Sequence, residues 1–210
     1  IPTPVGPVAL RGKIDRVDVA EADGETLIRV VDYKTGSKSF NLTELYYGLN
    51  LQLMVYLLAL CAMHRGGAIV PAGGFYFSLS WPYVEKEKEA EERQKAFRMS
   101  GFLLAEQTAV QAFDPNLRLN SEGEFYNEET AFTREEMEGL LELTKRLLGD
   151  AFGKLYTGNL DICPAQYQGR TPCMYCDYIG ICRFCEQTNA FRDVLPVKKE
   201  EILSGLEGGR

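Results

Sequence analysis

The sequence has 210 residues, of which 45% are hydrophobic and 25% are charged, and its formal net charge is −7. A chain of this length can bury one substantial core, and the negative charge argues against a basic protein that coats nucleic acid non-specifically. The longest apolar run, 51–62, is interrupted by Gln52 and is too short to span a bilayer, and no signal peptide precedes it. We therefore expect a single-domain cytoplasmic protein.

Two β-rich runs near the N-terminus predict a hairpin. β-branched residues alternate in 8–20 and again in 26–33, and Asp23 with Gly24 supplies a turn signal between the two runs. Side chains two residues apart on a strand point to the same face of a sheet. The hairpin therefore predicts which polar residues of the two runs can meet.

A helix and a third strand are expected after the hairpin. Asn41 and Glu44 resemble a capping box, and leucines then recur at helical spacing. We expect one helix of about five to six turns that ends near residues 65–67. Aromatic and small residues alternate in 74–81, which predicts the strand.

The second half of the sequence predicts a charged excursion and a long amphipathic helix. Residues 85–95 are almost wholly charged, so they form either a solvated helix face or a mobile excursion. Thr133 with Glu136 is an N-cap pattern, and apolar residues follow at helical spacing as far as a stop at Gly158. The segment after this helix is irregular and rich in cysteine.

Asp15, Asp32 and Lys34 form the candidate catalytic group. Asp32 and Lys34 share a strand face, and pairing of the hairpin strands can bring Asp15 beside them. Two carboxylates can hold Mg²⁺, which polarises a phosphoryl oxygen and lowers the pKa of bound water. A lysine can stabilise charge on the phosphate or orient the attacking water. For an isolated Asp-x-Lys tripeptide, solvated surface charge would be the better interpretation.

Gln52 and Tyr56 are four residues apart and therefore share one face of the predicted helix. The alternative interpretation is that Tyr56 belongs to the core and Gln52 is a polar residue at its boundary. Their position after the two acidic segments, in a fixed order, favours a place at the same site.

The order GKIDR (12–16), VDYKTG (31–36) and Gln52 with Tyr56 resembles the RecB-family nuclease domain of the PD-(D/E)XK superfamily. Segments 71–77, 98–102 and 171–184 further resemble the C-terminal nuclease domain of AddB-like subunits of bacterial AddAB helicase–nucleases. The resemblance covers nearly the whole sequence. It implies an α/β fold of restriction-endonuclease type, with a mixed central sheet flanked by helices and an irregular Cys-rich C-terminal segment.

The resemblance also implies the domain organisation and the roles of the site residues. It implies a nuclease core over 1–160, an iron–sulfur-type segment over 161–190 packed on the same domain, and a tail over 191–210. The metal would be Mg²⁺ or Mn²⁺. The implied metal ligands are Asp15, Asp32 and the backbone carbonyl of Tyr33, with Lys34 as the catalytic lysine and Gln52 and Tyr56 near the site and the DNA.

The expected substrate is DNA, as a single strand produced by unwinding, and the expected partner is a helicase–nuclease subunit resembling AddA. Together they would resect double-strand breaks for recombinational repair. Several basic residues close to the acidic motifs in the sequence are candidate DNA ligands. They are Arg11, Lys13, Arg16 and Lys38.

Five of the six cysteines lie in the last quarter of the sequence, at positions 163, 173, 176, 182 and 185. In a cytosolic protein this crowding points to a metal or an iron–sulfur cluster rather than to disulfides. On spacing alone, a four-cysteine zinc site and an iron–sulfur cluster are both open. The resemblance implies a [4Fe–4S] cluster in the full-length parent, held by Cys173, Cys176 and Cys182, with Cys185 as a substitute ligand and Cys163 outside the pattern. Cys61 is expected in the core.

Two elements of the family pattern are expected upstream of Asp15: a helix motif, usually with a histidine, and a fourth cysteine for the cluster. The only histidine, His64, does not match that motif and is expected at a helix end or on the surface. We therefore expect a segment of a longer protein that, alone, binds metal weakly, cuts DNA poorly or not at all, and holds no cluster or an incomplete one. A catalytically silent DNA-binding or scaffold module and a zinc-binding interaction domain stay open as alternatives.

Overall fold

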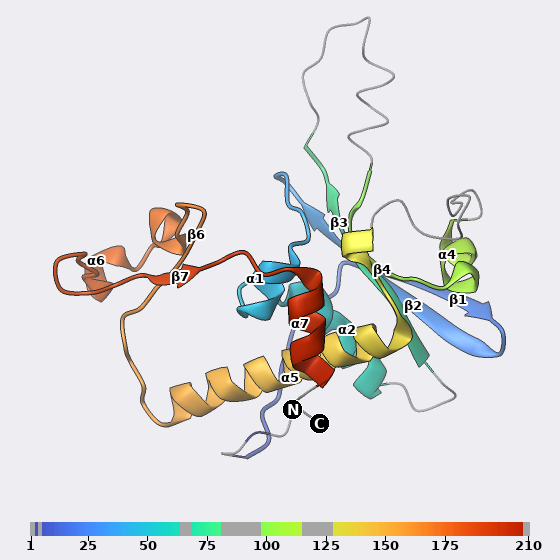
Figure 1. Cartoon of the computed structure of the whole chain (residues 1–210), viewed down its shortest axis with the longest axis horizontal. Helices are drawn as coiled ribbons and strands as arrows, with labels where there is room; N and C mark the ends of the chain where they lie inside the picture. Colours follow the sequence, from blue (N-terminus) through green and yellow to red (C-terminus); the bar gives the residue numbers. More distant parts are fainter. Residues whose placement is uncertain (1–2, 4–5, 64–68, 81–97, 115–127, 208–210) are drawn as a thin grey trace, which may run out of the picture.

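The centre of the molecule is a five-stranded mixed sheet with the strand order β1-β2-β3-β4-β5 (Figure 1). The computed structural model describes residues 3, 6–63, 69–80, 98–114 and 128–207. Strands β2 and β3 are parallel, as are β4 and β5, whereas β1 and β4 run antiparallel to their neighbours β2 and β3. The strands are β1 (Arg16–Ala22), β2 (Glu25–Lys34), β3 (Ile69–Ser78), β4 (Ser100–Leu104) and β5 (Ala131–Phe132).

Helices cover both faces of this sheet. Helices α2 (Gln52–Met63) and α5 (Arg134–Tyr156) pack on the face that carries Ile28 and Val30, where they enclose the larger group of buried side chains. Helix α4 (Gln107–Phe113) packs on the opposite face, against alternate residues of the same strands. The prediction of an α/β fold with a mixed sheet flanked by helices is confirmed.

The predicted hairpin is present, but its first strand is shorter than expected. Asp23 and Gly24 both have positive φ angles, of 52° and 79°, as a tight two-residue hairpin turn requires. Strand pairing begins only at Arg16, opposite Val31. The backbone N–H of Tyr33 lies beyond that pair and donates instead to the side chain of Asp15, at 3.1 Å. A carboxylate therefore takes the place of the next ladder hydrogen bond, and residues 8–15 form no strand.

The single long helix predicted after Asn41 is wrong, because the structure has two helices there. Asn41 caps helix α1 (Leu42–Tyr46) by accepting from the Glu44 N–H at 3.0 Å, as expected. Gly48 then adopts φ 76°, and the N–H groups of Gly48 and Leu49 donate to the carbonyls of Leu45 and Glu44. This is a Schellman motif, which ends a helix at a left-handed residue. Helix α2 therefore starts afresh at Gln52.

The predicted N-cap of the long helix α5 is confirmed. Thr133 and Glu136 form a reciprocal capping box, with hydrogen bonds of 2.9 and 3.2 Å. The helix ends at Tyr156, two residues before the expected stop at Gly158. The charged excursion at 85–95 and His64 lie outside the described residues. None of the described helices is both long and apolar enough to cross a bilayer.

After α5 the chain forms a Cys-rich lobe, residues 161–194, that projects away from the sheet (Figure 1). Its elements are short, and its two strands pair in parallel. The elements are β6 (Ala165–Tyr167), the 3-10 helix η3 (Pro172–Tyr175), α6 (Ile179–Cys182) and β7 (Arg192–Val194).

The chain then comes back to the core around the five-stranded sheet through a return segment, residues 195–207, which is part of the region for which we expected a tail. It contains helix α7 (Lys199–Glu207), whose Ile202 is fully buried. The hydroxyl of Thr43 accepts from the Val197 N–H at 3.2 Å, and the Lys199 ammonium donates to the Ala131 carbonyl at 2.6 Å. The lobe is therefore tied to the core at both of its ends.

Candidate functional site

Four of the predicted site residues meet at the C-terminal end of β2. Asp32 and Lys34 project from the same face of the strand, and the Lys34 ammonium lies 2.6 Å from Oδ2 of Asp32. Gln52, the first residue of α2, accepts from Lys34 at 2.8 Å through Oε1. Its Nε2 donates to Oδ1 of Asp32 at 2.7 Å and to the Tyr56 hydroxyl at 2.8 Å. Gln52 therefore fixes the carboxylate and the ammonium together.

The Asp32 carboxylate is buried, and its two oxygens have different partners. Its exposed fraction is 2%, and Oδ1 accepts the hydrogen bond from Gln52. Oδ2 lies in the ion pair with Lys34, but among the described residues no donor approaches it with hydrogen-bond geometry. A buried carboxylate oxygen is destabilising unless a hydrogen bond or a cation compensates it, and the Lys34 ammonium at 2.6 Å compensates Oδ2. A metal ion bound at Oδ2 would therefore share or replace this contact with Lys34.

Asp15 lies at the same end of the strand. It is exposed and precedes β1, and its Oδ2 accepts the N–H of Tyr33, the residue between Asp32 and Lys34. Extending the β1–β2 register by one residue sets Asp15 opposite Asp32. The structure thus brings both acidic motifs and the lysine to one edge of the sheet.

The donor set of this edge fits a hard divalent cation. In the described part of the chain, no three Cys, His, Asp or Glu side chains are close enough to hold one metal ion. Two carboxylates are what this edge offers, and Mg²⁺ is commonly held by one or two carboxylates together with waters and substrate phosphates. That Asp15, Asp32 and the Tyr33 carbonyl are the metal ligands stays a prediction.

A second buried polar group adjoins this network, and the sequence analysis did not identify it. Tyr76 lies on β3 in register with Asp32, is 2% exposed, and donates from its hydroxyl to Oδ1 of Asn50 at 2.7 Å. The Asn50 amide donates in turn to Glu44 at 3.3 Å. Burial, with smaller contributions from the charges of Asp32 and Glu44, raises the pKa of the Tyr76 hydroxyl well above its usual range. A polar Asn50 within an apolar helical pattern was the available signal.

The predicted basic patch divides into two parts. Arg11 and Lys13 are exposed on the segment that leads to Asp15, and Lys38 reaches the site, with its ammonium 5.4 Å from the centre of the Tyr76 ring. Arg16 points to the opposite face of the sheet, where it pairs with Asp18 at 2.7 Å. Hydrogen bonds from the guanidinium to Asp18 and to the Tyr33 side chain raise the pKa of Arg16. Of the four basic residues, Arg16 is thus engaged in the fold.

The cysteines of the lobe are not gathered around one point. All six cysteines of the chain are free, and Cys173 is half-buried whereas Cys163, Cys176, Cys182 and Cys185 are exposed. The absence of any three-ligand group among the described residues applies to these thiols as well. Their present arrangement does not fit a cluster, so the cluster assignment stays a prediction. Cys61 packs against the core, and burial raises the pKa of its thiol.

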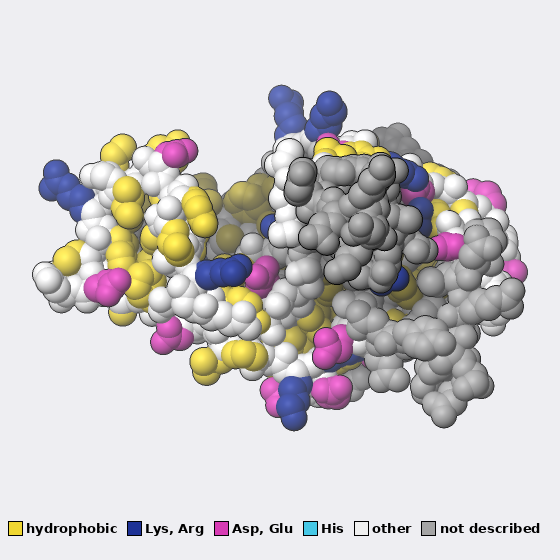
Figure 2. Space-filling view, turned by 90° about the horizontal axis from the view of Figure 1, so that it is seen from above, with side chains coloured by type: hydrophobic (Ala, Val, Ile, Leu, Met, Phe, Trp, Pro, Cys, Tyr) yellow, Lys and Arg dark blue, Asp and Glu magenta, His cyan; other side chains and the backbone are white. Residues whose placement is uncertain are grey.

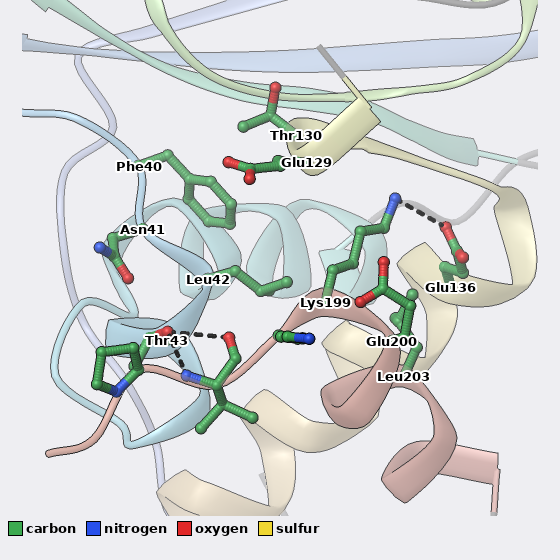
Figure 3. A pocket seen from close by; sticks show the side chains of 13 residues that line it. Phe40, Asn41, Leu42, Thr43, Glu129, Thr130, Glu136, Lys199, Glu200 and Leu203 are labelled. Carbon is green, nitrogen blue, oxygen red and sulfur yellow. Dashed lines mark hydrogen bonds and ion pairs between the residues drawn. The ribbon is translucent and has the colours of Figure 1, made fainter.

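A pocket of about 830 Å³ lies apart from this network, between α1, the 3-10 helix η2 (Glu128–Thr130), α5 and α7 (Figure 3). Its wall contains Phe40, Leu42 and Leu203 beside the charged Lys199 and Glu200. None of the motif residues lines it. The pocket is therefore not the candidate catalytic site.

Comparison with known proteins agrees with this geometry. A family model described as the PD-(D/E)XK nuclease superfamily matches residues 3–183. The chain is 38% identical to the B subunit of the ATP-dependent helicase/deoxyribonuclease of Carboxydothermus hydrogenoformans, over 95% of this chain and 20% of that protein. It is 33% identical to the subunits of the same name from Listeria monocytogenes and Clostridium kluyveri, each over 95% of this chain and 19% of the relative.

The chain spans about a fifth of the length of these curated relatives. The resemblance to AddB-like subunits that the motifs predicted is confirmed over nearly the whole chain. The matched region contains the mixed sheet, α2 and the Asp32 network. The chain belongs to the PD-(D/E)XK nuclease superfamily.

Proposed function

We propose that this chain is a metal-dependent deoxyribonuclease domain that hydrolyses phosphodiester bonds in DNA. The observation that carries the proposal is the buried Asp32 carboxylate at the end of β2, which forms an ion pair with Lys34 and accepts a hydrogen bond from Gln52. Family membership supports the nuclease chemistry, and the name of the relatives includes deoxyribonuclease.

The residues at the end of β2 would have different roles in the reaction. Asp15, Asp32 and the Tyr33 carbonyl would hold Mg²⁺ or Mn²⁺, which when bound polarises the phosphoryl oxygen and lowers the pKa of its water. Lys34 donates from its ammonium to the phosphate or to the attacking water. Gln52 orients both groups, because its carbonyl accepts from Lys34 while its amide donates to Asp32.

The substrate and the partner belong to the same proposal. The relatives are named as subunits of helicase/deoxyribonucleases, which supports a single DNA strand produced by unwinding as the substrate. A helicase–nuclease subunit resembling AddA would supply that strand during resection of double-strand breaks. Lys38, Arg11 and Lys13 are the basic residues placed to contact its phosphates. A cluster held by Cys173 and its neighbours takes no part in the cleavage step proposed here.

The decisive experiment compares the full-length parent with its Asp32→Asn and Lys34→Ala variants on end-labelled single-stranded DNA in Mg²⁺. Each substitution should lower the cleavage rate by at least about a hundredfold, since each removes a charge needed at the reacting phosphate. Asp150→Asn, the same change at an exposed position of α5, is the matched control and should leave the rate unchanged.

A second measurement does not depend on turnover. Isothermal titration with Mn²⁺ should show binding to the full-length parent and to its Asp150→Asn variant, and loss of binding to its Asp32→Asn variant. Cleavage that survives in Asp32→Asn would overturn the assignment. DNA binding without any cleavage by the full-length parent would favour the catalytically silent module over the nuclease.

A further inference from the structure

We propose that Tyr76 is a positioning residue whose ring holds two lysine ammonium groups, those of Lys34 and Lys38, at the candidate site. The catalytic consequence rests on the proposed nuclease function. The placement of the two lysines beside the ring does not rest on that function. The placement and its catalytic consequence can therefore be rejected separately.

The ring belongs to the buried core and contacts both cations. The Lys34 ammonium is 5.5 Å and the Lys38 ammonium 5.4 Å from the centre of the Tyr76 ring. Both distances are within the range over which the face of an aromatic ring attracts a cation, and the attraction grows when the pair is shielded from water. Tyr76 is 2% exposed, and the side chain of Lys34 retains 28% exposure. The ring therefore offers both ammonium groups a shielded aromatic contact.

The ring itself is fixed at both ends. Its backbone belongs to β3 and pairs with Asp32 of β2, while its hydroxyl donates to the buried Asn50 at 2.7 Å. Asn50 reaches this position because the helix breaks at Gly48, and its amide is held by Glu44. Since neither end can move without breaking a buried contact, the orientation of the ring is set by the fold.

Lys34 needs such a contact because its strongest partner has another task in the proposed reaction. Its ammonium lies 2.6 Å from Oδ2 of Asp32 and 2.8 Å from Oε1 of Gln52. When the Asp32 carboxylate serves a metal ion, the Gln52 carbonyl and the Tyr76 ring are the contacts that still retain the ammonium. A second ammonium at the same ring, that of Lys38, fits a ligand with several anionic oxygens, such as the phosphate backbone of DNA.

The placement can be tested by NMR on the chain with ¹³C-labelled lysine. The ring current of Tyr76 should shift the terminal methylene resonances of Lys34 and Lys38 upfield of the other lysines, with assignments from Lys34→Arg and Lys38→Arg. Tyr76→Leu should abolish both shifts, whereas Tyr76→Phe, which keeps the ring, should retain most of them.

The matched control is Phe102→Leu, which removes an equally buried ring of the same core whose aromatic neighbours are Phe40 and Phe132. It should leave both lysine resonances in place. If neither lysine is shifted in the unmodified chain, or if Phe102→Leu moves them as much as Tyr76→Leu does, the proposal is overturned. The unmodified chain alone decides the first of these outcomes, even if a variant fails to fold.

The kinetic consequence is measured separately. Tyr76→Leu should lower kcat for DNA cleavage about three- to thirtyfold, and Tyr76→Phe should restore most of it. Lys38→Met should raise KM for DNA more than it lowers kcat. Shifted lysine resonances in a chain that never cleaves DNA would retain the placement and reject the nuclease function. Equal kcat in Tyr76→Leu and the unmodified chain would reject the positioning role.

Discussion

The nuclease core and the Cys-rich lobe bury their apolar residues very differently. In the core, Tyr76 is 2% and Phe102 0% exposed, whereas in the lobe Tyr175 is 88% and Ile181 80% exposed. Figure 2 shows hydrophobic side chains spread over the surface of the lobe. The core therefore organises its site by packing, while the lobe has free thiols and little core of its own, a composition that usually depends on a metal or another staple.

The largest expected effect is a difference in the free energy of unfolding between two variants, each with one side chain truncated, one in the core and one in the lobe. Leu140→Ala, at a fully buried position of α5, should lower the free energy of unfolding by about 3 kcal/mol because it leaves a cavity. Ile181→Ala, at an exposed position of the lobe, should change it by less than about 0.5 kcal/mol. Urea unfolding followed by circular dichroism measures both. Similar losses in the two variants would show that the lobe surface is packed in solution.

Acid should act on a charged network of the core. Asp18 accepts from Arg16 and Arg29. Burial raises the pKa of the Asp18 carboxyl, but the hydrogen bonds from the two arginines outweigh it, so the pKa lies below its usual value. A carboxyl whose pKa is lower in the folded than in the unfolded state stabilises the fold. This contribution is complete above the unfolded-state pKa of about 3.9 and is lost as the pH falls through the folded-state pKa.

Asp18→Asn should therefore lower the free energy of unfolding by about 1–2 kcal/mol at about pH 7, and by progressively less towards about pH 2. Urea unfolding of both proteins across this range measures the difference. Glu21→Gln, at the exposed far end of the same strand, is the control. A difference that stays constant with pH would exclude an ionised Asp18 as its source.

Thiol reactivity should rank the cysteines by region. Burial raises the pKa of Cys61 and lowers its thiolate fraction, so its labelling by a disulfide reagent should be at least about tenfold slower than that of the exposed thiols. Mass spectrometry of the labelled peptides measures each rate. The four exposed cysteines expected to react first are Cys163, Cys176, Cys182 and Cys185.

Anaerobic reconstitution with iron and sulfide extends this test. Protection of Cys173, Cys176 and Cys182, with Cys163 still reactive, would support the predicted cluster ligands. Additional protection of Cys185 would identify it as the substitute ligand. Unchanged labelling of all the lobe cysteines would contradict cluster binding by this chain.

The smallest expected effect concerns the junction between the two regions. The Thr43 hydroxyl accepts from the N–H of Val197 and donates to its carbonyl, at 3.2 and 3.3 Å. Thr43→Val removes both hydrogen bonds and should lower the free energy of unfolding by about 1 kcal/mol. It should also raise the amide hydrogen exchange of α7 more than that of α5. An equal increase in amide exchange in the two helices would mean that the junction does not hold the return segment.

The shared face of Asp32 and Lys34 and that of Gln52 and Tyr56 were predictable from local periodicity, whereas the fold class and the meeting of the two pairs were implied by the family resemblance. A strand places alternate residues on one face, and a helix places residues four apart together. The capping box at Thr133 was predictable for the same reason, since it is encoded within four residues.

Features that depend on tertiary contacts were not predictable in this way. The break at Gly48 was not predicted, and the buried partner of Asn50, the Tyr76 hydroxyl, is 26 residues away in the sequence. The role of Asp15 in replacing a ladder hydrogen bond needed the register of the hairpin. The docking of α7 likewise depends on Thr43, which is 154 residues before Val197.

The order of the elements along the chain has a consequence for biosynthesis. A ribosome releases α1 and α5 before the lobe, and α7 only after the last lobe cysteine. Until α7 docks on the core, the lobe is tethered at one end alone. The hydrogen bonds of the return segment to Thr43 and to Ala131 can therefore form only after the whole lobe has been synthesised.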